Sequence, residues 1–110
     1  MIKVMALIKR KSTVSHEEFV RHYEEVHAPL ALKLFPMIKK YVRNHIITPL
    51  GAQEPDFDCI TEFWFDSPES AQAIVDIRMS AAGKPIRDDE ETFMAMSKMV
   101  SFLVDERVTR

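Results

Sequence analysis

The side chains best suited to chemistry are His27, which opens the stretch His27-Ala28-Pro29-Leu30, and Tyr23, one helical turn before it. Side chains four residues apart on a helix lie on the same face, so these two can meet. Pro29 has no backbone donor and disfavours helical geometry at the residue before it, so we expect the helix to end or kink there. His27 would then stand at a helix end, able to act as a general acid or base on a small ligand. The alternative is a structural histidine stabilised by the helix dipole, with Tyr23 as a core aromatic.

Two stretches of alternating side chains, residues 37–47 and 58–65, are expected to form strands that carry further polar groups. If the strands pair with these groups on the same side, five side chains form one wall of a cavity. The connection over residues 48–57 is too long to fix the register, and it is itself a candidate pocket rim. The structural alternatives are packing for the aromatic side chains and a histidine bonded to a neighbour. The five side chains are Tyr41, Arg43 and His45 on the first strand and Glu62 and Trp64 on the second.

Other common kinds of site are not indicated by the sequence. The four histidines lack the spacing that places two of them on one helix face, and there is no Cys-x-x-Cys pair, so no metal site is predicted. With only two glycines, the chain has no glycine-rich phosphate loop. Cys59 is the only cysteine, and its place in an expected strand favours a buried thiol over a nucleophile. We therefore expect no cofactor.

The elements that must position these groups follow from the apolar pattern and from the capping residues. Ser15 and Glu18 form a capping box at the start of one helix, and Ser67 with Pro68 marks the start of another. The expected elements are a strand over residues 2–9, the helix from Ser15 to Pro29, a short helix over 30–35, strands over 37–47 and 58–65, the helix from Pro68 to a break at 83–85, a short helix from Asp88 to about Ser97, and a strand over 98–105. This order predicts a ferredoxin-like βαββαβ fold of the α+β class, with one extra short helix, in a single domain over residues 1–110.

The expected sheet has more apolar surface than two helices can cover. Two main helices shield one face of a four-stranded sheet, while the strands carry apolar side chains on both faces. A bare apolar face is an association site, so we expect a homodimer in which two sheets pack face to face into an α/β barrel. The space between the sheets is then the expected cavity for a small hydrophobic or aromatic ligand.

Composition excludes several other functions and partners. The net charge is −2 with acidic and basic residues interspersed, which argues against a nucleic-acid surface. No stretch approaches the roughly 20 apolar residues that span a bilayer, so no membrane partner is expected. The first nine residues lack the features of a signal peptide, and the lone cysteine cannot form an internal disulfide. We therefore expect a cytoplasmic protein.

Taken together, several motifs resemble those of the EthD domain family, and the resemblance covers essentially the whole chain. The motifs are Phe19–Leu30, Lys40–Asn44, Phe57–Asp58, Glu62–Asp66 and Phe102–Glu106. The resemblance implies a dimeric α/β barrel of the ferredoxin-like superfamily. That superfamily includes muconolactone-type isomerases, polyketide cyclases, cofactor-free quinone-forming monooxygenases and haem enzymes.

The resemblance also implies roles for individual residues. Relatives such as methylmuconolactone isomerase and small fungal polyketide dehydratases or decarboxylases use a pocket histidine and tyrosine in proton transfer, without metal or haem. His27 is thereby the leading catalytic candidate, with Tyr23 and Tyr41 beside it. The expected substrate-binding residues are Asn44, His45 and Trp64, together with Glu62 from the same expected wall.

The sequence leaves more than one function open. The first is a cofactor-independent lyase or isomerase that moves a proton next to a carbonyl of a small cyclic, aromatic or polyketide-like intermediate. The alternative is a non-catalytic accessory protein that binds a hydrophobic intermediate for an oxygenase system. A third function is haem-dependent oxidation. It is supported only by the resemblance to a superfamily that includes haem enzymes, because no residues stand at haem-ligand spacing.

Overall fold

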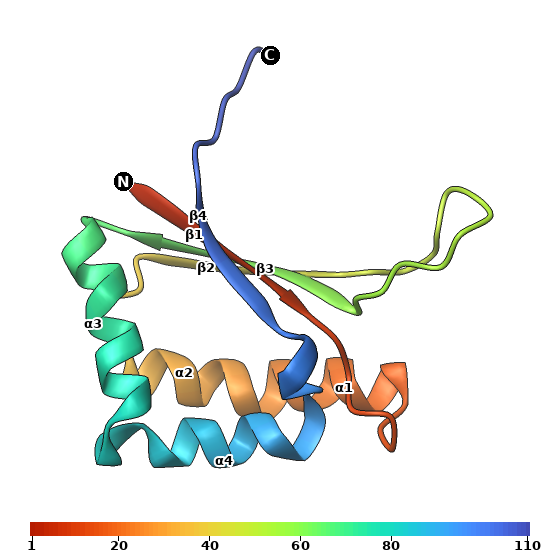
Figure 1. Ribbon diagram of the computed structural model, residues 1–110, viewed down its shortest axis with the longest axis horizontal. Coiled ribbons are helices and arrows are strands. Elements are labelled where there is room, and N and C mark those ends of the chain that lie inside the picture. Colours follow the sequence, from red (N-terminus) through yellow and green to blue (C-terminus); the bar gives the residue numbers. More distant parts are fainter.

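The computed structural model describes all 110 residues as a four-stranded antiparallel sheet with its helices on one side (Figure 1). The strand order is β2-β3-β1-β4, which confirms the expected ferredoxin-like α+β fold. No helix is both long and apolar enough to cross a bilayer. The elements are β1 (Ile2–Ile8), α1 (His16–His22), the π-helical turn η1 (Tyr23–His27), α2 (Ala28–Leu34), β2 (Lys40–His45), β3 (Cys59–Phe65), α3 (Pro68–Met79), the 3₁₀ turn η2 (Ala81–Gly83), α4 (Lys84–Phe93), the 3₁₀ turn η3 (Met96–Lys98) and β4 (Val100–Val104).

The first helical run does not end at Pro29, and the expectation that Ala28 would leave helical geometry and place His27 at a helix end is wrong. α1, η1 and α2 follow one another without interruption, and Ala28 keeps the helical angles φ −62° and ψ −45°. The run accommodates the proline by widening into a π turn, in which the Ala28 N–H donates to the Tyr23 carbonyl five residues back. His27 therefore lies buried within a continuous helical run, and not at a helix end.

The helix before the last strand also starts earlier than its caps suggested. We expected residues 83–85 to break the chain and Asp88 to cap a short helix. Instead, α4 begins at Lys84 with Pro85 in its first turn, where proline needs no acceptor. Its buried face consists of Ile86, Glu90 and Phe93, which recur at helical spacing.

The pairing of the strands decides which side chains face the helices. Tyr41 lies opposite Phe63, and Arg43 lies opposite Thr61, on the face that packs against the helices. The other face, which we call the open face, has no helix over it (Figure 1). Its apolar side chains are Met5, Leu7, Val42, Ile60, Trp64, Val100, Phe102 and Val104, and its polar ones are Lys3, Lys40, Asn44 and Glu62.

The turn between α3 and α4 depends on the absence of a side chain at Gly83. A Cβ atom there would clash with the backbone carbonyl oxygens of Ile77 and Arg78, which are not free to move. We predict that Gly83→Ala lowers the free energy of unfolding by about 1–3 kcal/mol, the usual cost of overpacking. Urea denaturation followed by circular dichroism measures this change.

Gly51→Ala is the matched control, because a Cβ at Gly51 would meet no atom within 4 Å. The control should stay within about 0.5 kcal/mol of the wild type. Equal stability of the two variants would show that the close approach at Gly83 does not constrain the fold.

Candidate active site

A cavity of about 440 Å³ lies between the sheet and the helices of a single chain, a size typical of sites for small organic ligands. Its walls are mostly apolar. The reason for the space lies in α3, none of whose residues is buried, while its Ala71, Ile74 and Val75 line the cavity. The cavity needs no second copy of the chain, which corrects the expectation that it would form only between two sheets.

Three polar side chains from two elements meet at one part of this cavity. Tyr23 from η1, His27 one turn later and Tyr41 from β2 all line it. The Tyr23 and His27 rings pack edge to face with centroids 5.4 Å apart, because residues four apart on a helical run lie on the same side of it. The structure thus brings together the three residues that were expected to be catalytic, and their catalytic role stays a prediction.

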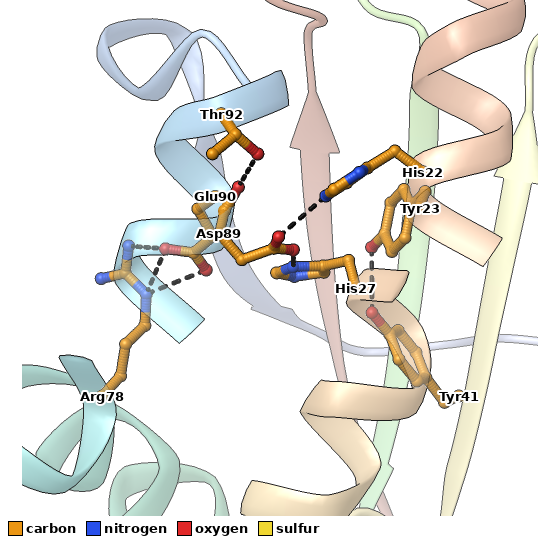
Figure 2. A network of polar contacts seen from close by, with 8 residues as sticks. All are labelled: His22, Tyr23, His27, Tyr41, Arg78, Asp89, Glu90 and Thr92. Carbon is orange, nitrogen blue, oxygen red and sulfur yellow. Dashed lines mark hydrogen bonds and ion pairs between the residues drawn. The ribbon is translucent and has the colours of Figure 1, made fainter. Parts of the chain in front are cut away.

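The two tyrosines form a chain of buried hydroxyl groups (Figure 2). The Tyr41 hydroxyl donates to the Tyr23 hydroxyl at 3.1 Å, and Tyr23 is bonded in turn to Thr61 Oγ1 at 2.7 Å. Burial raises the pKa of both tyrosines well above the usual value of a phenol. Both hydroxyls therefore keep their protons at neutral pH and can serve as hydrogen-bond donors.

Asp89 on α4 fixes the orientation and the tautomer of His27. Nδ1 of His27 lies 2.8 Å from Asp89 Oδ2, and the carboxylate can only accept, so Nδ1 carries the proton (Figure 2). Nε2 forms no hydrogen bond within the chain, and the side chain lines the cavity. His22 donates to the other oxygen of the same carboxylate at 2.8 Å, which holds Asp89 in place.

The surroundings of His27 favour its neutral form. Burial lowers its pKa, and the hydrogen bond to Asp89 opposes this shift only in part. A neutral imidazole with its proton on Nδ1 presents the Nε2 lone pair to the cavity. This arrangement can take a proton from a bound molecule and stabilise the resulting imidazolium through Asp89.

An ion pair forms a second polar part of the cavity lining. Arg78 from α3 holds Glu90 from α4 through two nitrogens, with Nη2 2.5 Å from Glu90 Oε1 (Figure 2). Glu90 is almost fully buried, whereas Arg78 keeps about a quarter of its side chain exposed. No three His, Cys, Asp or Glu side chains gather as a metal would require.

Sequence reasoning missed the partners that orient the candidate residues. Thr61 and Asp89 lie 38 and 62 residues from the side chains they hold, and no local pattern links positions so far apart. Glu90 carried a usable signal, since it shares helical spacing with Ile86 and Phe93 and so had to point inward.

Three of the expected substrate-binding residues lie away from the cavity. Asn44, Glu62 and Trp64 belong to the open face, so the expectation that Glu62 and Trp64 share one wall with Tyr41 is wrong. The physical reason is register: Tyr41 pairs with Phe63, which puts the even-numbered residues of β3 on the opposite side. Asn44 donates to Glu62 at 2.8 Å there.

His45 and the long loop have other surroundings than expected. His45 does face the helices, but it is bonded to Glu24 at 2.8 Å beside the cavity rather than lining it. The Glu24 carboxylate also accepts hydrogen bonds from the Arg43 guanidinium. These hydrogen bonds are the main reason that the pKa of Glu24 falls to about 2. The loop over residues 48–57 extends away from the helices and forms no rim of this cavity (Figure 1).

Comparison with known proteins agrees with this fold. The family model of the EthD domain matches residues 11–97, most of the chain. The chain belongs to the EthD domain family. No curated protein sequence matches this EthD domain protein significantly.

Solved structures of similar fold include members of the same family. One is an EthD family protein from Bacillus halodurans, with 24% identity, a TM-score of 0.71 and coverage of 97% of this chain and 99% of that one. The Arabidopsis thaliana protein At3g17210 has 14% identity and a TM-score of 0.70, covering 100% and 99%. A dimeric ferredoxin-like protein from Bacteroides fragilis has 10% identity and a TM-score of 0.64, covering 96% and 95%. At these identities the likeness shows the fold alone.

The opposing effects on His27 give a prediction that does not depend on a substrate. Because the hydrogen bond to Asp89 raises the pKa of His27 against the effect of burial, Asp89→Asn should lower that pKa further. NMR titration of ¹³C- and ¹⁵N-labelled histidines measures the change. Asp88→Asn, at an exposed neighbour paired with Lys84, should leave the pKa of His27 where it is in the wild type. A pKa in Asp89→Asn equal to or above that of the wild type would contradict the pairing.

Proposed function

We propose that this EthD domain protein is a cofactor-independent lyase or isomerase that acts by proton transfer on a small cyclic, aromatic or polyketide-like intermediate. The observation that carries the proposal is the unpaired Nε2 of His27, held toward an apolar cavity by Asp89. The family of this protein and the solved structures with a similar ferredoxin-like fold support a function related to small molecules. The reaction type is our inference from the geometry.

In the proposed reaction, Nε2 of His27 removes a proton from a carbon next to a carbonyl group of the ligand. The electron pair of the broken C–H bond moves to the carbonyl oxygen. In the proposed complex the Tyr41 hydroxyl proton turns from the Tyr23 oxygen, to which it is donated in the free protein, and donates to this carbonyl oxygen. Asp89 stabilises the imidazolium through the proton on Nδ1. Return of the proton to another carbon completes an isomerisation, and its transfer to a departing hydroxyl group releases water and completes a dehydration.

Replacing the base should abolish the proton transfer while leaving the cavity intact. We predict that the wild type accelerates deuterium incorporation next to the carbonyl of 2-tetralone, an uncharged bicyclic ketone, in D₂O. His27→Gln should lose this acceleration by about 100-fold or more, the usual contribution of a general base. ¹H NMR of the ketone follows the exchange, and saturation-transfer NMR shows that the ketone is bound.

His16→Gln is the matched control, because His16 is bonded to Asp58 outside the cavity and should not affect the exchange. Equal exchange in the wild type and His27→Gln would remove His27 as the base. Binding of 2-tetralone to the wild type without exchange above the buffer rate would favour the non-catalytic accessory protein instead.

We further propose that a second copy of the chain covers the open face. Val100, at its edge, is 47% exposed, and Phe102 next along the face is 41% exposed. The charged pair Lys3 and Glu62 stands on the two central strands of this face, and the side chains around it are mostly apolar. A largely apolar face without a covering layer is typical of an association site. A neighbouring structure from Bacteroides fragilis is described as dimeric, which supports the same arrangement here.

A charge on the open face should therefore separate the two copies. We predict that the wild type sediments as a dimer at micromolar concentration and that Val100→Glu sediments as a monomer, because the new carboxylate would be buried without a partner. Leu32→Glu, at a similarly exposed leucine on α2, should remain dimeric. A monomeric wild type in analytical ultracentrifugation would contradict the proposal.

A further inference from the structure

Two histidines of the first helical run share the carboxylate of Asp89. Nε2 of His22 lies 2.8 Å from Oδ1, and Nδ1 of His27 lies 2.8 Å from Oδ2 (Figure 2). Residues five apart in an α-helix point about 140° away from each other, so an ordinary helix would not direct both rings at one group. The π turn, whose hydrogen bond spans five residues, brings both rings to the side of α4. The turn that accommodates Pro29 thus also creates a His–Asp–His contact.

The shared carboxylate sets opposite tautomers on the two rings in their neutral forms. A carboxylate can only accept, so His22 carries its proton on Nε2, whereas His27 carries its proton on Nδ1. The side chain of His22 is 29% exposed and that of His27 is 5% exposed. His22 does not line the cavity, so it cannot touch a ligand there. Its hydrogen-bonded connection to the base runs through Asp89.

A donor on Oδ1 changes how strongly the carboxylate acts on His27. The Nε2–H of His22 compensates part of the carboxylate charge, so Asp89 holds a proton on His27 less strongly than an unshared carboxylate would. Burial is the main cause that lowers the pKa of His27, the hydrogen bond to Asp89 raises this pKa, and the positive charge of a protonated His22 lowers it. His22 and burial therefore act in the same direction, towards a neutral imidazole.

The other groups that face His27 do not depend on this contact. The charge of Glu90 also raises the pKa of His27, and Glu90 is held by Arg78 from α3. The hydroxyls of Tyr23 and Tyr41, from η1 and β2, keep their protons and are uncharged at neutral pH. Removing the donor on Oδ1 leaves all four of these groups in place.

We propose that His22 is a positioning residue for the base of the proposed reaction: it fixes Asp89 through Oδ1 and keeps that carboxylate from holding a proton on His27 too tightly. A base that stays protonated at neutral pH cannot remove a proton from a ligand. The proposal rests on the proposed function for its catalytic meaning, whereas its effect on His27 is measured without any ligand. It also gives the π turn a task, because that turn brings both histidines to one carboxylate.

The first experiment replaces His22 and follows His27 by NMR titration of ¹³C- and ¹⁵N-labelled histidines. His22→Phe removes the donor but keeps an aromatic ring against Phe93, whose centroid lies 4.5 Å from that of His22. We expect the pKa of His27 to rise above the wild-type value, the opposite of the change expected for Asp89→Asn. His22→Gln can place an amide N–H near the position of Nε2 and should give a smaller rise. Thermal melting checks that both variants fold.

His16→Phe is the matched control. It makes the same substitution at another histidine of α1, which is bonded to Asp58 outside the cavity, and should leave the pKa of His27 unchanged. The wild type supplies a further measurement if the His22 variants do not fold. At a pH above its titration, the ¹⁵N shifts of His22 should show a protonated Nε2 and an unprotonated Nδ1, the reverse of His27.

The pH dependence of deuterium exchange into 2-tetralone tests the catalytic meaning of the contact. Exchange needs the neutral base, so its rate falls at pH values below the pKa of His27. A raised pKa in His22→Phe should move this acid limb to higher pH, and the rate at a fixed pH on the limb should fall about tenfold for each unit of the move. A purely structural loss would instead lower the rate equally at all pH values.

Four results would overturn the proposal: a pKa of His27 in His22→Phe equal to or below that of the wild type, an equal rise in His22→Gln, a neutral His22 with its proton on Nδ1, or an acid limb that stays in place while the pKa of His27 rises. Failure of the proposed function looks different. It would appear as equal exchange of 2-tetralone in the wild type and His27→Gln, while the pKa of His27 still rises in His22→Phe.

Discussion

The contact between Nδ1 of His27 and Asp89 is the interaction on which the account of the site depends. It joins the π turn of the first helical run to α4 across 62 residues of sequence. Because Asp89 can only accept, the contact sets the tautomer of the imidazole and directs its free nitrogen to the cavity. Burial alone would also keep His27 neutral, but it would not decide which nitrogen carries the proton.

The cavity exists because the helices leave part of the sheet uncovered on their own side. The helical run from His16 to Leu34 and α4 pack closely, while α3 buries none of its residues and leaves its apolar side chains facing space. A ligand that fills this space would bury the apolar side chains of α3, which is a favourable change. Binding is thus coupled to completion of the core, and a ligand should stabilise the fold by an amount that rises with the logarithm of its concentration above the dissociation constant.

Much of the fold could be predicted from the sequence because its signals are local. The capping serine of α1 and the start of α3 at Ser67 and Pro68 lie where they were expected, and each of the four strands lies within its expected range but is shorter than that range. Pro29 misled because the rule for residues before proline describes an ordinary helix, and a π turn satisfies the same backbone groups differently.

The site could be predicted only in part. His27 and Tyr23 were accessible because helical spacing is a short-range property. Which face of β3 meets Tyr41 depends on strand register, and a shift by one residue exchanges the two faces. The connection between β2 and β3 does not fix that register, so Glu62 and Trp64 were assigned to the wrong side. Asp89 could not be found at all, since no sequence pattern joins it to His27.

The proposed site requires His27 to be neutral at pH 7, with its proton on Nδ1 and with Nε2 free. The ¹⁵N chemical shifts of a selectively labelled protein test this most directly, because protonated and unprotonated ring nitrogens differ widely in shift. We predict a protonated Nδ1 and an unprotonated Nε2 for His27 at pH 7, with the signals assigned by their loss in His27→Gln. A proton on Nε2, or on both nitrogens, would contradict the account.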